Sequence, residues 1–217
     1  MAEIVPTILT DNPELFRSQL ETYAKFAKRV QIDFLDGKFT AQATIPLSAM
    51  APLPGNIQTD LHVMVVRPSQ YLPDILKLKP TRCIFQAECG EDLLPIFAEL
   101  KKAGIGTGLA LMVPTYPGDV KAYLAAVDHV LIFAGELGKQ GGKADLLQIE
   151  KVKVVQSVAN KTLEIGWDGG ANMSNVRMLA HAGIQVINVG NAIAAAENPA
   201  AAHKELSDEA DRKGVVI

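Results

Sequence analysis

Short apolar runs recur along the whole chain, and amphipathic or turn-rich stretches separate them. Most of these runs are continuously apolar, which is typical of parallel strands with helices packed on the outside. The pattern predicts eight strands, namely Glu3–Leu9, Arg29–Asp33, Gln58–Met64, Arg82–Gln86, Gly106–Leu111, His129–Phe133, Thr162–Asp168 and Val186–Val189.

Helical periodicity fills most of the intervening stretches. The expected helices are Asn12–Ala27, Glu91–Ala103, Ala144–Ala159 and Ser174–Ala182, with a short one over Leu47–Ala51 among prolines. Asp11 or Asn12 supplies the N-cap side chain of the first helix. Gly104 and Gly183 stand just past two helix ends, where glycine readily takes a left-handed backbone conformation.

The alternation of strand and helix predicts an α/β fold. Eight units of about 27 residues each suit a compact (β/α)8 TIM barrel. No linker or low-complexity tract divides the chain, so we expect one TIM-barrel domain over residues 1–217. An open doubly wound sheet is the alternative. It is disfavoured because no Gly-x-Gly-x-x-Gly pattern follows the first strand.

Composition narrows the function classes. The chain is 48% hydrophobic and 21% charged with a net charge of -3, which indicates a globular protein and argues against nucleic acid or an anionic membrane as partner. We find neither an apolar run of membrane-spanning length nor a secretory signal pattern. Cys83 and Cys89 lie too far apart on one extended segment to pair, so we expect reduced thiols and a cytoplasmic location.

Three side chains near strand ends carry the chemistry. Asp33, His62 and Asp168 would converge at the C-terminal mouth of a barrel, where two carboxylates and an imidazole indicate proton transfer or metal binding. Singly, each has a plainer interpretation as a capping, core or turn residue. Asp60 shares a strand face with His62 and could orient its imidazole. The other histidines fall at a strand start or on helices.

Glycines after the late strands favour phosphate binding. Asp168-Gly169-Gly170 permits close backbone approach to a ligand, and Gly190-Asn191 opens a helix whose free N–H groups attract an anion. The glycine-rich loop 135–143 is either a mobile lid, with Lys139 or Lys143 adding charge to a phosphate grip, or a flexible solvated loop. No lysine ends strand four, five or six, which argues against a Schiff-base aldolase.

The ordered motifs resemble the ribulose-phosphate 3-epimerase family over essentially the whole chain. They are Pro6-Thr7-Ile8-Leu9, Ile32-Asp33-Phe34-Leu35-Asp36-Gly37-Lys38-Phe39, Leu61-His62-Val63-Met64, Trp167-Asp168-Gly169-Gly170 and Gly190-Asn191-Ala192-Ile193. The resemblance implies a TIM barrel that interconverts ribulose 5-phosphate and xylulose 5-phosphate. Family members use two aspartates as acid and base, and two histidines with those aspartates hold a divalent metal.

Carried over by position, the resemblance assigns roles to individual residues. Asp33 and Asp168 would be the acid/base pair and metal ligands, and His62 would be a further metal ligand. Contacts with the substrate would come from Thr7, Met64, Gly138, Gly141, Gly169, Gly170, Gly190 and Asn191.

Several family positions are changed in this chain. Gln31 replaces the first metal histidine, Gln86 replaces the strand-four histidine, and Asn191 replaces a serine. Gln31 therefore becomes the fourth metal ligand, through a neutral amide oxygen that binds zinc-like metals less well than imidazole does. The metal (Zn, Mn, Fe or Mg) stays open. So does a metal-free site in which Gln31 donates a hydrogen bond to the enediolate oxygen.

The resulting prediction is an isomerase that epimerises D-ribulose 5-phosphate at C3. Alternatives are a related barrel acting on another ketose phosphate, and a non-catalytic barrel that binds a sugar phosphate. A keto-sugar phosphate decarboxylase is disfavoured, because its Asp-x-Lys-x-x-Asp pattern is absent at Asp60-Leu61-His62. The expected partners are a small sugar phosphate and further copies of the chain in a homo-oligomer.

Overall fold

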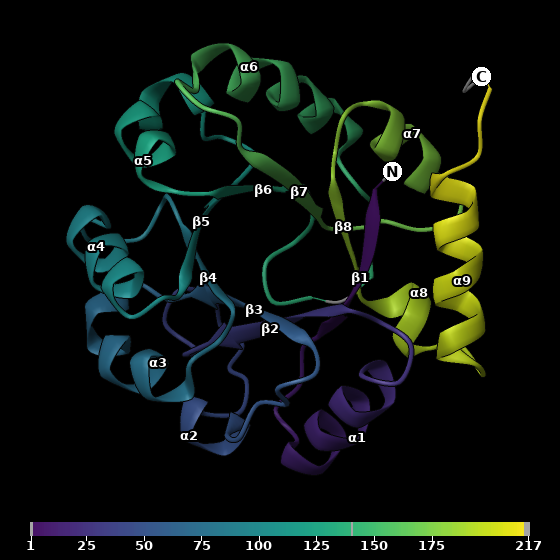
Figure 1. Cartoon of the computed structure of the whole chain (residues 1–217), viewed down its shortest axis with the longest axis horizontal. Helices are drawn as coiled ribbons and strands as arrows, with labels where there is room; N and C mark the ends of the chain where they lie inside the picture. Colours follow the sequence, from purple (N-terminus) through teal and green to yellow (C-terminus); the bar gives the residue numbers. More distant parts are fainter. Residues whose placement is uncertain (1, 140, 215–217) are drawn as a thin grey trace.

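The computed structural model describes residues 2–139 and 141–214, and within them the strands close into a parallel barrel (Figure 1). The strands are β1 (Glu3–Ile8), β2 (Arg29–Leu35), β3 (Gln58–Met64), β4 (Arg82–Gln86), β5 (Gly106–Leu111), β6 (His129–Phe133), β7 (Glu164–Asp168) and β8 (Val186–Val189). Each strand pairs with the next, and β8 pairs with β1 through the register Glu3↔Val186. This closure confirms the predicted TIM barrel and excludes the open sheet.

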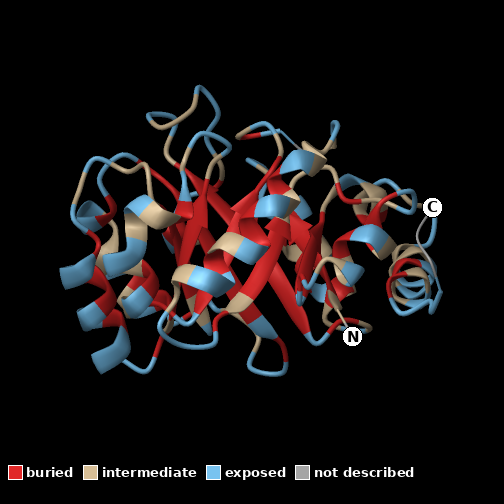
Figure 2. Ribbon diagram, turned by 90° about the horizontal axis from the view of Figure 1, so that it is seen from above, coloured by how far each residue is buried: buried red, intermediate tan, exposed pale blue. Residues whose placement is uncertain are grey.

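Helices follow the strands and surround the barrel, with their exposed faces outward (Figure 2). They are α1 (Pro13–Tyr23), α2 (Leu47–Met50), α3 (Leu72–Leu78), α4 (Leu94–Lys102), α5 (Lys121–Ala126), α6 (Glu150–Val158), α7 (Val176–His181), α8 (Asn191–Ala194) and α9 (Pro199–Ala210). Short 3-10 turns η1 (Pro68–Gln70), η2 (Pro117–Val120) and η3 (Leu146–Ile149) precede α3, α5 and α6. No helix in the described ranges combines the length and apolarity needed to cross a membrane.

Element ends differ modestly from the sequence prediction. β2 runs two residues past Asp33, because Phe34 and Leu35 continue the ladder with β3. The first helix ends at Tyr23, because Lys25 and Phe26 donate to carbonyls three residues back and not four. Asn12 is its N-cap, and its side chain accepts from two backbone amides of the first turn at 2.8 and 3.1 Å.

The main core lies between the strands and the helices. Cys83 and Phe85 point outward from β4, and the Phe85 ring lies 6.2 Å from that of Phe97 on α4. Trp167 is fully buried in this shell. Each such side chain contributes roughly 1.5–3 kcal/mol, whereas a surface ion pair contributes about 0–1 kcal/mol. Helix packing therefore stabilises the barrel more than surface charge does.

The barrel interior is layered. A small apolar cluster of Ile84, Ala110 and Leu131 is separate from the outer core and occupies the middle. Polar side chains fill the interior on either side of it. The N-terminal end holds charged residues, and the C-terminal end holds the candidate chemistry. In this fold the C-terminal end carries function and the N-terminal end carries stability.

An ionic cluster closes the N-terminal end. Arg29 donates to Asp60 Oδ2 at 2.8 Å through Nε and to Glu164 Oε2 at 3.0 Å through Nη2. Glu164 also accepts from Arg82 at 2.7 Å and pairs with His129 Nδ1 at 2.8 Å. The suggestion that Asp60 orients His62 is therefore wrong. Although both face inward, residues two apart on a strand are separated by about 6.6 Å along it, and Asp60 is held by Arg29 one layer below.

The Glu164 carboxylate should make stability depend on acid pH. Burial would raise the pKa of Glu164, but hydrogen bonding and charge from His129, together with Arg29, lower it below its ordinary value. A carboxyl with a lowered native pKa stabilises the fold above its ordinary pKa, and this stabilisation disappears as pH falls through the native pKa. Glu164→Gln should therefore weaken the fall in unfolding free energy between about pH 5 and pH 3, measured by urea denaturation.

The matched control is Glu99→Gln, which removes an exposed carboxylate that pairs with Lys102 on the surface. Solvent screens such a pair, so this control should keep the wild-type pH dependence. An identical acid slope in Glu164→Gln and wild type would show that the cluster does not contribute to acid sensitivity.

Candidate active site

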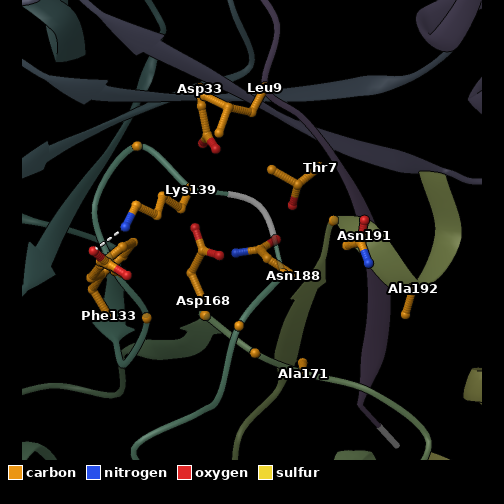
Figure 3. A pocket seen from close by; sticks show the side chains of 18 of the residues that line it. Thr7, Leu9, Asp33, Phe133, Lys139, Asp168, Ala171, Asn188, Asn191 and Ala192 are labelled. Atoms are coloured by element: carbon orange, nitrogen blue, oxygen red, sulfur yellow. Dashed lines mark hydrogen bonds and ion pairs between the residues drawn. The ribbon is translucent and has the colours of Figure 1, made fainter. Parts of the chain in front are cut away.

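A cavity of about 170 Å³ opens at the C-terminal ends of the strands (Figure 3). Typical pockets for drug-sized ligands measure roughly 300–1,000 Å³, so this one suits a small metabolite. Its lining includes the expected acids and the expected substrate contacts, Thr7, Asp33, Met64, Gly138, Gly141, Asp168, Gly169, Gly170, Gly190 and Asn191. Gln31 and His62 are fully buried and reach the two acids from inside the barrel.

Two carboxylates from distant strands meet through one amide. Asp33 stands on β2 and Asp168 ends β7. Gln31 Nε2 donates to Asp33 Oδ1 at 2.9 Å and to Asp168 Oδ2 at 2.6 Å. Because two nearby anions repel strongly in a low-dielectric interior, a shared donor is needed to keep them together. The Gln31 amide supplies it.

His62 completes this arrangement. Its Nδ1 lies 3.3 Å from Asp33 Oδ1 and 3.6 Å from Asp168 Oδ2, and its Nε2 lies 3.0 Å from the Gln86 amide. Burial alone would lower the pKa of His62, but hydrogen bonding with Asp168 and Asp33 raises it to about 9. A protonated ring donates from both nitrogens. The Gln86 amide would then turn its Oε1, which accepts from no described group, toward His62 Nε2.

The acid closer to the barrel interior has a perturbed ionisation. Burial raises the pKa of Asp33 to about 6, and the charge of Asp168 adds to the rise, while His62 and Gln31 oppose it. A carboxyl that titrates near neutral pH can both accept and release a proton during turnover.

The residues also suit a divalent cation. One ligand atom from each of Asp33, His62 and Asp168 lies within 4.8 Å of the others. Gln31 Nε2 faces both acids, and its buried Oε1 accepts from no group in the described ranges, so rotation of the amide would turn this oxygen toward a cation held by the acids. Two carboxylates, an imidazole and an amide oxygen are ligands that hard or borderline divalent metals accept. The donor set therefore fits the metal that the sequence resemblance implied.

The glycines beyond β7 allow two loops to touch. Gly169 has φ +111°, and a Cβ there would lie 2.1 Å from the backbone nitrogen of Gly135. Gly170 has φ +66°, and its Cβ would lie 2.3 Å from the nitrogen of Ala144. Neither separation is possible for a real side chain. These glycines let the turn after β7 pack against the loop after β6, so that both loops line the pocket.

The loop after β6 contributes less charge than the sequence suggested. Lys139 lines the pocket, but its Nζ lies 2.5 Å from Glu136 Oε1 on the same loop. Lys143 is exposed and is absent from the lining formed by the described residues. Gln140 lies outside the described ranges. Glycine residues, more than lysine side chains, line this end of the cavity.

One buried pocket residue was missed from the sequence. Asn188 on β8 is 3% exposed and lines the cavity beside Asp168 (Figure 3). The only signal was a polar residue inside the apolar run Val186–Val189. Such a residue can equally well be a buried structural amide, and only the position of its strand next to β7 places it in the pocket.

A comparison with known families now becomes informative. The sequence profile described as the Ribulose-phosphate 3 epimerase family matches residues 3–194. The chain belongs to this family. Its resemblance to the family, its fold and its interpretation as an epimerase-like isomerase, all expected from the sequence, are confirmed at this level.

Relatives within the ribulose-phosphate 3-epimerase family are distant but nearly full-length. The enzyme of that name from Mycobacterium leprae is 26% identical over 205 residues, covering 92% of this chain and 91% of its own. The one from Bacillus subtilis is 26% identical over 200 residues, covering 89% and 92%.

Two solved structures illustrate the shared fold. 3-Hexulose-6-phosphate synthase from Salmonella typhimurium has a TM-score of 0.70 at 16% identity, covering 96% of this chain and 98% of its own. Orotidine 5'-phosphate decarboxylase from Pyrococcus horikoshii has a TM-score of 0.69 at 14% identity, covering 97% and 100%. These likenesses establish the fold alone.

The close approach at Gly169 gives a testable consequence. Gly169→Ala should lower the melting temperature by roughly 5–10 °C, because the new methyl group meets the Gly135 backbone at a strained φ. Thermal unfolding followed by circular dichroism measures the change. Gly55→Ala is the control, since a Cβ there has nothing within 4 Å. Equal melting temperatures for the two variants would contradict the proposed loop contact.

Proposed function

We propose that this protein interconverts D-ribulose 5-phosphate and D-xylulose 5-phosphate by inverting carbon C3. The observation that carries the proposal is the pair of acids, Asp33 and Asp168, held side by side through Gln31 at one end of a small polar cavity. Membership in the ribulose-phosphate 3-epimerase family supports the same reaction class.

The substrate's phosphate belongs at the glycine end of the pocket. Gly169, Gly170 and Gly190 place backbone there without side chains, and Asn191 follows directly. Consecutive backbone N–H groups bind anions without needing a basic side chain. Gly141 borders the same end beside Asn191, whereas Gly138 lies against Thr40 and Gln42 of the loop after β2. Thr7 and Met64 also line the pocket. With the phosphate at the glycines, the sugar carbons would lie between it and the carboxylates.

The proposed proton transfer uses two carboxyl groups that act on the same sugar carbon, C3. One of Asp33 and Asp168 accepts the C3 proton from one face of the sugar. The C–H electron pair forms the C2–C3 double bond, and the carbonyl pair moves onto the C2 oxygen, giving a 2,3-enediolate. The other carboxyl donates a proton to the opposite face of C3, which inverts the centre and restores the ketone. The phosphate anchors the sugar during both steps.

Asp33, His62, Asp168 and Gln31 would hold a divalent metal (Zn, Mn, Fe or Mg). When bound, such an ion supplies positive charge that stabilises the negative charge developing on the sugar oxygens. The Gln31 ligand favours a harder ion than imidazole does, because its donor is an amide oxygen. His62 would bind through Nδ1, the ring nitrogen that faces both acids.

Other functions fit the site less well. A decarboxylase that needs the strand-three aspartate at the mouth is disfavoured, because Asp60 is locked to Arg29 at the opposite end of the barrel. A non-catalytic sugar-phosphate binder has no need for a buried acid with a raised pKa beside a second acid. Another ketose phosphate as substrate is the alternative that the same acids would also serve.

The proposal is tested by incubating the protein with D-ribulose 5-phosphate in deuterated water. We expect D-xylulose 5-phosphate that carries deuterium at C3, detected by NMR and mass spectrometry. Binding without exchange would contradict catalysis and support a binding protein. Exchange with a different ketose phosphate, and none with this one, would change the substrate while keeping the acid pair.

Replacing one acid separates chemistry from binding. Asp168→Asn should lower kcat by about 10²- to 10⁴-fold, the contribution typical of a general acid or base. Calorimetric affinity for D-ribulose 5-phosphate should change little, because the phosphate contacts stay. Asp128→Asn, the same substitution at an exposed residue paired with Lys161, is the control and should keep full turnover. Wild-type rates in Asp168→Asn would exclude the assigned role.

Restoring a histidine should strengthen metal binding. In Gln31→His the imidazole replaces an amide oxygen, so affinity for zinc should rise about tenfold or more. Metal content by mass spectrometry and titration calorimetry measure this directly. Gln58→His adds a histidine at an exposed position at the start of β3 and should leave metal binding unchanged. Unchanged metal content in Gln31→His would refute the four-ligand site.

A further inference from the structure

We infer that Asn188 determines substrate specificity by binding the C4 hydroxyl of a ketose 5-phosphate. This inference rests on the proposed function, since it names the part of the sugar that the same pocket recognises. No sequence motif includes this residue, and its role follows from its position in the barrel.

Asn188 faces the cavity, whereas its neighbours on β8 pack into the hydrophobic core. Ile187 and Val189 on either side of it belong to the outer hydrophobic core. Successive side chains on a strand point to opposite faces, so Asn188 points into the barrel. It is 3% exposed, and Figure 3 shows its amide group between Asp168 and the β1 side of the pocket.

The amide oxygen of Asn188 needs a donor. Oδ1 is buried, and no group within the described ranges donates a hydrogen bond to it. An orphaned buried acceptor costs about 1–3 kcal/mol, so such groups in a pocket are commonly satisfied by the ligand. A carbonyl oxygen repels a phosphate dianion but accepts from a hydroxyl. The group that binds here is therefore a sugar hydroxyl and not the phosphate.

Position along the pocket selects which hydroxyl. β7 and β8 pair through Gly166↔Val186 and Trp167↔Ile187, so the register carried one residue further places Asp168 beside Asn188. Gly190, at the phosphate end, follows two residues later on the same face. Asn188 thus lies between the acid that acts at C3 and the site of the C5 phosphate. The carbon between those two is C4.

An amide at this place reads both the presence and the configuration of the C4 hydroxyl. Oδ1 accepts the hydroxyl hydrogen, and the amide N–H can donate to the hydroxyl oxygen. A sugar without that hydroxyl leaves the buried oxygen unsatisfied, which is the situation in which hydrogen-bonding sites discriminate most strongly.

The test combines a side-chain deletion with a hydroxyl deletion. Asn188→Leu removes the amide at similar volume, and the 4-deoxy analogue of D-ribulose 5-phosphate removes its partner. With D-ribulose 5-phosphate, kcat/KM of Asn188→Leu should fall about 10- to 100-fold relative to wild type. With the 4-deoxy analogue the two proteins should differ little, because the contact is already lost. Equal losses with both sugars, or no loss with either, would overturn the inference.

Two further variants control for changes in packing and for substitutions away from the pocket. Asn188→Val, shorter and β-branched as strands prefer, repeats the test if the leucine overfills the barrel. Asn160→Leu makes the same substitution at an exposed residue in the loop before β7, at the far end of the barrel. It should behave like wild type with both sugars, and thermal melting checks the fold of each variant.

Calorimetry separates this inference from the proposed reaction. If wild type fails to epimerise D-ribulose 5-phosphate, the proposed function is wrong, and dissociation constants replace kcat/KM in the same comparison. Weaker binding of the 4-deoxy sugar to wild type but not to Asn188→Leu still supports Asn188 as the hydroxyl contact. Identical preferences in both proteins would refute it whatever the turnover.

Discussion

The bridge from the Gln31 amide to Asp33 and Asp168 is the contact on which the candidate site depends. Two carboxylates inside a barrel would repel each other if nothing stood between them, and the charge of Asp168 contributes to the raised pKa of Asp33. One Nε2 atom donates to both, at 2.9 and 2.6 Å, and His62 adds positive charge from below. These partners keep two acids close without any backbone element joining them.

The interior of the barrel divides this chemistry from the supports of the fold. Charged residues around Arg29 and Glu164 close the N-terminal end, where Glu164 accepts hydrogen bonds from both Arg29 and Arg82. Ile84, Ala110 and Leu131 then form a small apolar cluster. The acids lie beyond this cluster, next to solvent and to the cavity. One barrel thus holds a stabilising ionic cluster near one end of its interior and a candidate reactive cluster near the other.

Loop packing sets the opposite boundary of the pocket. Gly169 and Gly170 permit the turn after β7 to approach the loop after β6 more closely than any side chain would allow. Their freedom at positive φ therefore shapes the cavity before any ligand enters. The same glycines line the pocket without side chains, so one local feature accounts for the loop packing and suits the proposed phosphate grip.

The sequence by itself determined the fold class and most members of the site. A closed barrel explains eight apolar runs that alternate with amphipathic helices. An acid or imidazole near the carboxyl end of a strand must then lie near the C-terminal end of the barrel. The partner of each polar group was decided by tertiary structure. Asp60 and His62 share a strand face, yet they have different partners. Barrel closure brings Arg29 and Arg82 to Asp60. It brings Asp33 and Asp168 to His62. From the sequence, Asn188 likewise looks like an ordinary strand residue. Only the position of β8 beside β7 brings it to the pocket. Contacts across a barrel join residues more than a hundred positions apart, and strand register sets their distance, which local patterns in the chain do not encode.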